Sequence, residues 1–181
     1  VHIIEQNILL TEENGIAEIE ICETYQNKTS LQQEIFYYFS LPKNAVITGL
    51  WLSDDGTHKK YPFNVSPRGA AQQVYKNEVQ MRIDPSLLEQ TGPNQYRLRA
   101  FPIPAITSWD RVSPDFEAHE YSDKLKLWMS YVCMATDGKY DLPVLSEKRN
   151  VYWDNKTKIT VNNRDILKSP GWLPESLQFV A

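Results

Sequence analysis

Apolar and polar residues alternate along most of the chain, and this period of two is the feature that most limits its fold. In the stretch QQEIFYYFSLP, Ile35, Tyr37 and Phe39 fall on one side of an extended chain, and Phe36 and Tyr38 fall on the other. Successive side chains of a strand point to opposite faces of a sheet. The stretches AEIEICETY, QYRLRAF and KLKLWMSYVCMA repeat the alternation. The pattern predicts many strands around a shared core.

Turn signals separate the alternating stretches. Asn14-Gly15 lies between HIIEQNILLT and IAEIEICETYQN, and Asn-Gly favours the type I′ turn because both residues accept positive φ angles. Asp54-Asp55-Gly56 is a second hairpin signal of the same kind. After KLKLWMSYVCMA, the segments RNVYWD and KTKITVN also have the composition of strands, with Asp154-Asn155 between them.

One segment follows a helical period instead. In SPRGAAQQVYKNEVQMR, small and apolar residues recur at helical spacing, Ser66 is a candidate N-cap and Pro67 suits the first helical position. The helix is predicted at about 67–82, because Asp84-Pro85 disfavours its continuation. Many short strands with one substantial helix predict a mainly β fold, an antiparallel β-sandwich, with 1–181 forming a single domain.

Charge and cysteine content exclude some functions. The net charge is −4 and Lys and Arg are not clustered, so we expect no nucleic-acid binding, which needs a concentrated basic face. Cys22 and Cys133 fall on opposite strand faces, so they are not expected to pair. Serine-hydrolase, nucleotide-binding and zinc-site motifs are absent from the sequence. The expectation is therefore a non-enzymatic domain without a cofactor.

Acidic residues gather in the segment 105–122 and just after it. A solvated surface loop is the simpler interpretation, and calcium binding is the alternative, because carboxylate oxygens ligate calcium. A hydrolase that uses Asp115 or Glu117 is a further alternative. The candidate metal ligands are Asp110, Asp115, Glu117, Glu120 and Asp123.

Three tryptophans are candidates for a ligand platform. Trp51 and Trp128 fall on the opposite strand face from their apolar neighbours, and Trp109 lies in the acidic segment. Exposed, coplanar rings would favour carbohydrate binding. Large apolar groups are usually covered, so the alternative is that these rings pack beneath another layer or a neighbouring domain.

Three segments resemble the VIT domain, the vault protein and inter-alpha-trypsin module. They are LPKNAVITGLWL, the helix around Ala70-Ala71 and Val74-Tyr75, and LLEQTGPNQYRLRAFPIPA. The resemblance extends from about Ile16 to Ala135. The third segment is most similar to VIT segments of large bacterial membrane proteins associated with exosortase and PEP-CTERM systems. Unlike the family, this chain replaces a short turn after Pro104 with the acidic segment.

The resemblance implies a β-sandwich with a helix and no catalytic residues. In the third segment, Leu87 and Leu88 are expected to enter the core, Pro93-Asn94 to form the turn, and Tyr96 to return to the core. Glu89 is expected to accept hydrogen bonds from turn amides, so that Glu89→Gln would change stability.

The chain opens with Val1 and without a signal-peptide pattern, so it is expected to be a soluble fragment of a longer protein. With the family resemblance, this predicts a non-enzymatic protein-interaction or structural module on the extracytoplasmic side of a membrane-associated parent. It would contact a protein partner or neighbouring domains through edge strands or the 105–122 loop. The alternative is a carbohydrate-binding β-sandwich.

Overall fold

The Asn14-Gly15 turn joins two long strands of the fold. Strand β1 (His2–Glu13) and strand β2 (Ile16–Gln26) pair antiparallel along their length, and Asn14 and Gly15 have φ angles of 54° and 79°. This confirms the predicted hairpin.

The structure is a computed structural model that describes residues 1–54, 68–81, 86–106, 124–166 and 171–178.

The described residues form two large sheets and one helix, α1 (Arg68–Met81). The helix agrees with the predicted range of about 67–82. The remaining strands are β3 (Gln33–Ser40), β4 (Val46–Asp54), β5 (Ser86–Gly92), β6 (Gln95–Ile103), β7 (Lys124–Met134), β8 (Tyr140–Asp141), β9 (Val144–Lys148), β10 (Lys158–Val161), β11 (Arg164–Asp165) and β12 (Ser176–Leu177).

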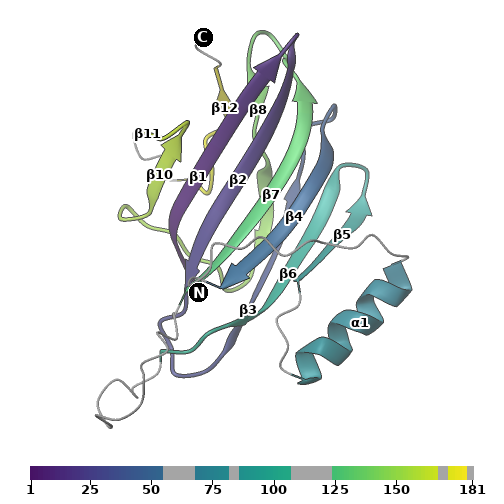
Figure 1. Cartoon of the computed structure of the whole chain (residues 1–181), viewed down its shortest axis with the longest axis vertical. Helices are drawn as coiled ribbons and strands as arrows, with labels where there is room; N and C mark the ends of the chain where they lie inside the picture. The colour runs from purple at the N-terminus through teal and green to yellow at the C-terminus, as the bar shows by residue number, and fades with distance from the viewer. Residues whose placement is uncertain (55–67, 82–85, 107–123, 167–170, 179–181) are drawn as a thin grey trace.

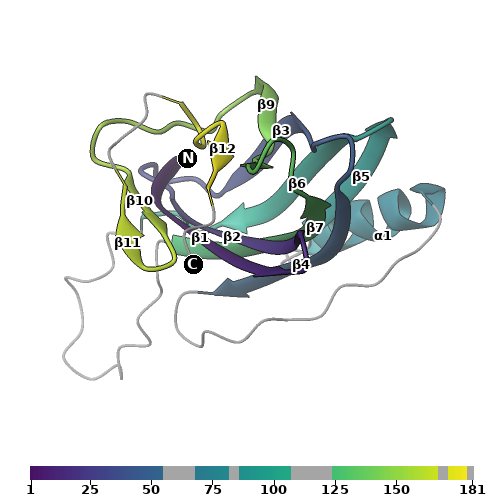
Figure 2. The ribbon, with the colours of Figure 1, turned by 90° about the horizontal axis from the view of Figure 1, so that it is seen from above.

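The two large sheets face each other as a sandwich (Figures 1 and 2). The six-stranded sheet has the order β11-β10-β1-β2-β7-β4, and the four-stranded sheet has the order β5-β6-β3-β9. A short pair, β12-β8, lies beside them. The helix packs against β5, at one edge of the four-stranded sheet (Figure 1). The fold is thus the predicted mainly β sandwich with one helix.

Alternation along each strand fills the space between the sheets. Ile19, Ile21 and Tyr25 from β2 meet Ile35 and Phe39 from β3 in one core, and all five are at most 2% exposed. Cys133 is buried on the inner face and Cys22 lies on the other face of its sheet, and both thiols are free. Their predicted separation is therefore confirmed.

Strand β4 contains a local irregularity that a glycine makes possible. Its register with β7 shifts between Ile47 and Gly49, which is the mark of a β-bulge. A Cβ atom on Gly49 would come within 1.9 Å of the Trp51 ring. The indole therefore lies directly over the backbone of its own strand, and only glycine leaves room for it.

The C-terminal third differs most from the prediction. The segment RNVYWD is not a strand, because only Tyr152 forms an isolated bridge, to His2. Strand β10 pairs parallel with β1 and antiparallel with β11, and β8 and β9 were not predicted. The predicted turn at 54–56, the helix cap at 66–67 and the 105–122 loop lie largely outside the described residues.

Candidate interaction surface

The segment 86–96 forms a hairpin between β5 and β6. Asn94 has a φ angle of 54°, as its place in the turn requires. Leu88 packs against the main core and Tyr96 stacks on Phe39 with ring centroids 5.6 Å apart. Leu87 is also buried, but it lies opposite Arg99 on the outer face, where the helix packs. Leu88 therefore packs between the two sheets, and Leu87 lies on the face that the helix covers.

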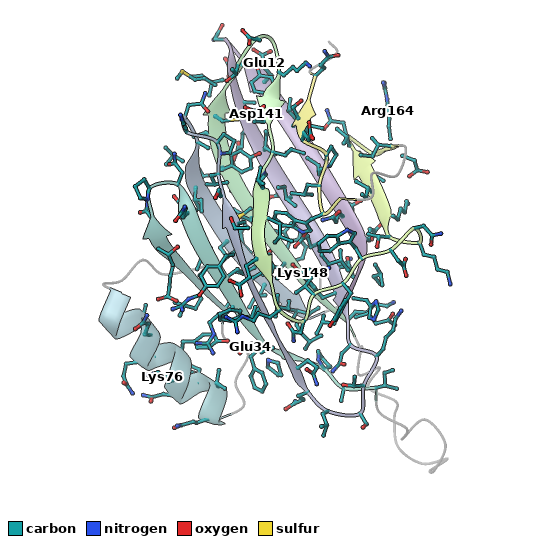
Figure 3. All side chains as sticks on the ribbon, turned by 180° about the vertical axis from the view of Figure 1, so that it is seen from behind. Glu12, Glu34, Lys76, Asp141, Lys148 and Arg164 are labelled. Carbon is teal, nitrogen blue, oxygen red and sulfur yellow. The ribbon has the colours of Figure 1, made fainter. Side chains whose placement is uncertain are left out.

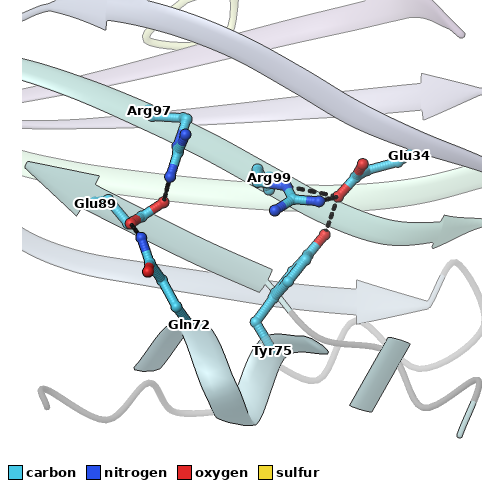
Figure 4. A network of polar contacts seen from close by, with 6 residues as sticks. All are labelled: Glu34, Gln72, Tyr75, Glu89, Arg97 and Arg99. Atoms are coloured by element: carbon cyan, nitrogen blue, oxygen red, sulfur yellow. Dashed lines mark hydrogen bonds and ion pairs between the residues drawn. The ribbon is translucent and has the colours of Figure 1, made fainter. Parts of the chain in front are cut away.

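Glu89 is the polar centre of the contact between helix and sheet (Figure 4). Its carboxylate is buried and accepts hydrogen bonds from Nε and a terminal nitrogen of Arg97, with 2.8 Å to Nε. The side-chain amide of Gln72 on α1 donates to the other oxygen. These partners are side chains of a strand and the helix, in place of the turn amides expected from the sequence. Glu89 therefore stabilises the contact between the helix and the sheet rather than the turn.

A second group of side chains repeats this arrangement one turn along the helix (Figure 4). The Tyr75 hydroxyl donates to Glu34 on β3, and Arg99 donates to the same carboxylate oxygen from 2.8 Å. The Arg99 guanidinium lies 4.6 Å from the centre of the Tyr75 ring. At the other edge of this sheet, Lys148 on β9 lies 4.0 Å from the Trp153 ring (Figure 3). The helix side of the outer face of the four-stranded sheet is thus occupied by its own contacts, whereas Lys148 lies in register with the inner-facing Tyr37.

The core contains a second buried carboxylate, that of Glu23. It accepts hydrogen bonds from the Gln6 amide at 2.7 Å and the Trp172 indole at 2.6 Å. The hydroxyls of Tyr25 and Tyr37 also donate to it. Burial raises the pKa of Glu23, and the hydrogen bonds oppose this shift only in part.

Sequence reasoning missed Glu23 as a special residue. Glu23 is two residues from both Ile21 and Tyr25, so strand alternation places it with them on the inner face. Alternation alone could therefore have predicted a buried carboxylate. Three of its donors come from the nearby strands β1, β2 and β3, and the fourth, Trp172, is 149 residues away in the sequence. Trp172 therefore fastens the C-terminal segment to the core.

The tryptophans singled out by the sequence have different environments. Trp128 is 8% exposed and lies opposite Trp51 in the register of β4 and β7. Trp51 is half-buried, with its ring over Gly49. Trp109 lies outside the described residues. The structure brings Trp51 and Trp128 together on the outer face of the six-stranded sheet.

The same outer face ends in a group of apolar side chains, which we name the sheet-end patch: Ile16, Val46, Val132 and Met134. Ile16 lies opposite Met134, and Val46 lies opposite Val132. Val132 and Met134 are two residues apart, so the four side chains are neighbours on one face. Ile16, Val46 and Met134 are 51%, 62% and 56% exposed.

The acidic candidates for a calcium site, Asp110, Asp115, Glu117, Glu120 and Asp123, lie outside the described residues. Within the described ranges, no three His, Cys, Asp or Glu side chains form a group able to hold a metal ion.

Burial raises the pKa of Cys22 to about 12 and that of Cys133 to about 11, so both thiols are protonated at neutral pH. No helix in the described part of the chain is long and apolar enough to cross a membrane.

Comparison with known proteins places these features in a family. Residues 5–110 match the Vault protein inter-alpha-trypsin domain. None of the curated proteins matches the chain. Among solved structures, the fold is similar to the crystal structure of ACE19, the collagen binding subdomain of the Enterococcus faecalis surface protein ACE. The identity is 9% and the TM-score 0.41, over 83% of this chain and 94% of that chain. Because the domain match spans more than half of its residues, this chain belongs to the VIT family.

Proposed function

We propose that the chain is a non-enzymatic protein-interaction module of a larger, membrane-associated protein on the extracytoplasmic side. The sheet-end patch is the observation that carries the proposal. It presents four adjacent apolar side chains from three strands, and three of them are more than half exposed. Contiguous exposed apolar residues mark protein-binding surfaces more often than scattered ones do.

The neighbouring edge strand supports the same location. Strand β4 is at the edge of the six-stranded sheet, and its first residue, Val46, belongs to the sheet-end patch. Residues 46–53 contain no Lys, Arg, Asp, Glu or Pro, which are the residues that usually protect an edge from pairing. A partner that contacts the sheet-end patch would therefore also meet a strand edge without these protecting residues.

The chemistry of the described residues supports a role without catalysis. The two cysteine thiols have raised pKa values, and a protonated thiol is a poor nucleophile. Glu23 is fully enclosed in the core by its own donors. As a finer assignment, we propose that the parent is a bacterial exosortase-associated membrane protein, which rests on the likeness of LLEQTGPNQYRLRAFPIP to VIT segments of that group.

The test is capture of a partner from a membrane extract of the source organism by the immobilised chain, with and without calcium. The double variant Val46→Glu, Met134→Glu adds two charges to the sheet-end patch. Both positions are exposed, so the variant is expected to fold and to lose the captured protein.

The matched control is Val144→Glu. Val144 is 64% exposed but lies on β9 of the other sheet. Capture of the same protein by the wild type and by Val144→Glu, with its loss in the double variant, supports the proposed surface. Equal capture by all three chains contradicts it. A result that depends on calcium would direct attention to the acidic segment.

A further inference from the structure

A groove crosses the outer face of the six-stranded sheet, beyond the sheet-end patch. It has a volume of about 520 Å³ and is bordered by residues of β1, β2, β7, β10 and β11. The β10–β11 hairpin, marked by Arg164 in Figure 3, stands at one side. Trp128 borders the other side with the small part of its surface that is exposed.

Polar groups that are not used by the fold point to a ligand in this groove. The side chains of Lys126, Asn163 and Asp165 border the groove and have no hydrogen-bond or ion-pair partner among the described residues. Thr160 donates to the side-chain oxygen Oδ1 of Asn7 at 2.5 Å, which leaves the side-chain nitrogen of Asn7 able to donate. The groove thus offers ammonium, amide and carboxylate groups from three strands and a turn.

The charges of the groove exclude strongly charged ligands. Glu5, Glu20 and Asp165 would repel an anion, and Lys126 and Lys158 would repel a metal cation. An apolar ligand would bury these groups without partners, which is unfavourable. A peptide main chain gains little over β1, β2 and β7, because the backbone groups of these strands already pair within the sheet.

We propose that this groove binds a neutral oligosaccharide. Sugar hydroxyls both donate and accept hydrogen bonds, which suits amides and carboxylates side by side. The C–H faces of the sugar suit Leu9 and the small exposed part of Trp128. The volume is within the range of small-ligand sites. This function is separate from the protein partner at the sheet-end patch, so either proposal can fail without the other.

Titration calorimetry of the whole chain with cellotetraose, maltotetraose and chitotetraose tests the proposal. At least one of these sugars is expected to bind. The double variant Asn163→Gly, Asp165→Ala should bind that sugar about tenfold more weakly, as the loss of hydrogen bonds implies. Glycine is chosen at position 163 because its φ angle is 62°. Lys126→Met, on the β7 side, should weaken binding similarly.

Asn155→Gly is the control, since Asn155 is exposed and does not border the groove. It should bind the sugar as the wild type does. The proposal is overturned if none of the three sugars binds, or if the double variant and Lys126→Met both bind like the wild type. Tighter binding of a sulfated tetrasaccharide than of any neutral one would also overturn it.

Discussion

Two glutamates are buried among the residues that the structure describes, and their surroundings are opposite. Glu89 is 4% exposed and meets a guanidinium, that of Arg97, between the helix and the four-stranded sheet. Glu23 is 1% exposed and meets only neutral donors from two tyrosines, a glutamine and a tryptophan. The first carboxylate has a countercharge, whereas the second has hydrogen bonds alone.

The difference decides how each site responds to protons. The hydrogen bond to Glu89 raises the pKa of Arg97, so the guanidinium stays charged over the whole physiological range. Burial raises the pKa of Glu23 because no cation compensates for the lost water. We infer that the stability of the core contact at Glu23 depends on pH.

Breaking the ion pair is expected to have the largest effect. Arg97→Ala leaves the Glu89 carboxylate buried with only Gln72 as a described side-chain donor. An uncompensated buried charge is costly, and we expect a loss of about 3 kcal/mol in the free energy of unfolding. Urea denaturation at pH 7 measures it. A loss below about 1 kcal/mol would mean that the pair behaves like an exposed salt bridge.

Removal of a neutral donor from Glu23 should have the next largest effect. Trp172→Phe keeps an aromatic ring near Tyr37 but deletes the indole N–H. A hydrogen bond to a carboxylate contributes about 2 kcal/mol, and the C-terminal segment should exchange its amide hydrogens faster. Unchanged stability together with unchanged exchange would show that Trp172 does not fasten this segment.

Neutralising Glu89 should cost less than removing Arg97. In Glu89→Gln, the amide oxygen still accepts from Arg97, and the guanidinium is 21% exposed, so water can solvate it. We expect a loss of about 1.5 kcal/mol, from the charge-assisted part of the hydrogen bond. If Glu89→Gln were as unstable as Arg97→Ala, the asymmetry between the two partners would be refuted.

The smallest effect is a change of stability with pH. The folded-state pKa of Glu23 lies above its ordinary value of 4.5. Its contribution to stability is therefore full below that value and is lost as the pH rises toward the folded-state pKa. Between pH 4 and pH 8, the wild type should lose stability relative to Glu23→Gln. A difference that stays constant, or grows with pH, contradicts the inferred shift.

The sequence predicted what local patterns determine. The Asn14-Gly15 hairpin, the helix at 68–81 and the alternation along β2, β3, β6 and β7 follow from neighbours in the chain. The family resemblance also predicted the hairpin around Asn94. All of these features arise within about 30 residues of sequence.

Pairings between distant segments were not predictable in this way. Strand β10 pairs parallel with β1, about 150 residues away, and the register of such a pair leaves no local signal. The same holds for Trp172 and Glu23, which are 149 residues apart. Glu89 and Arg97 are eight residues apart, on the two strands of one hairpin, so their contact is local. The contact between Glu89 and Gln72 depends instead on how the helix packs against the sheet.

Hydrogen–deuterium exchange of the chain, alone and with the protein that it captures, tests the central claim most directly. The claim is that the sheet-end patch and the adjacent edge of β4 bind a protein partner. It predicts slower exchange at the start of β2 and β4 and at the end of β7, with β9 unchanged. Protection that is confined to β9 or to the helix, or no protection at all, would contradict it.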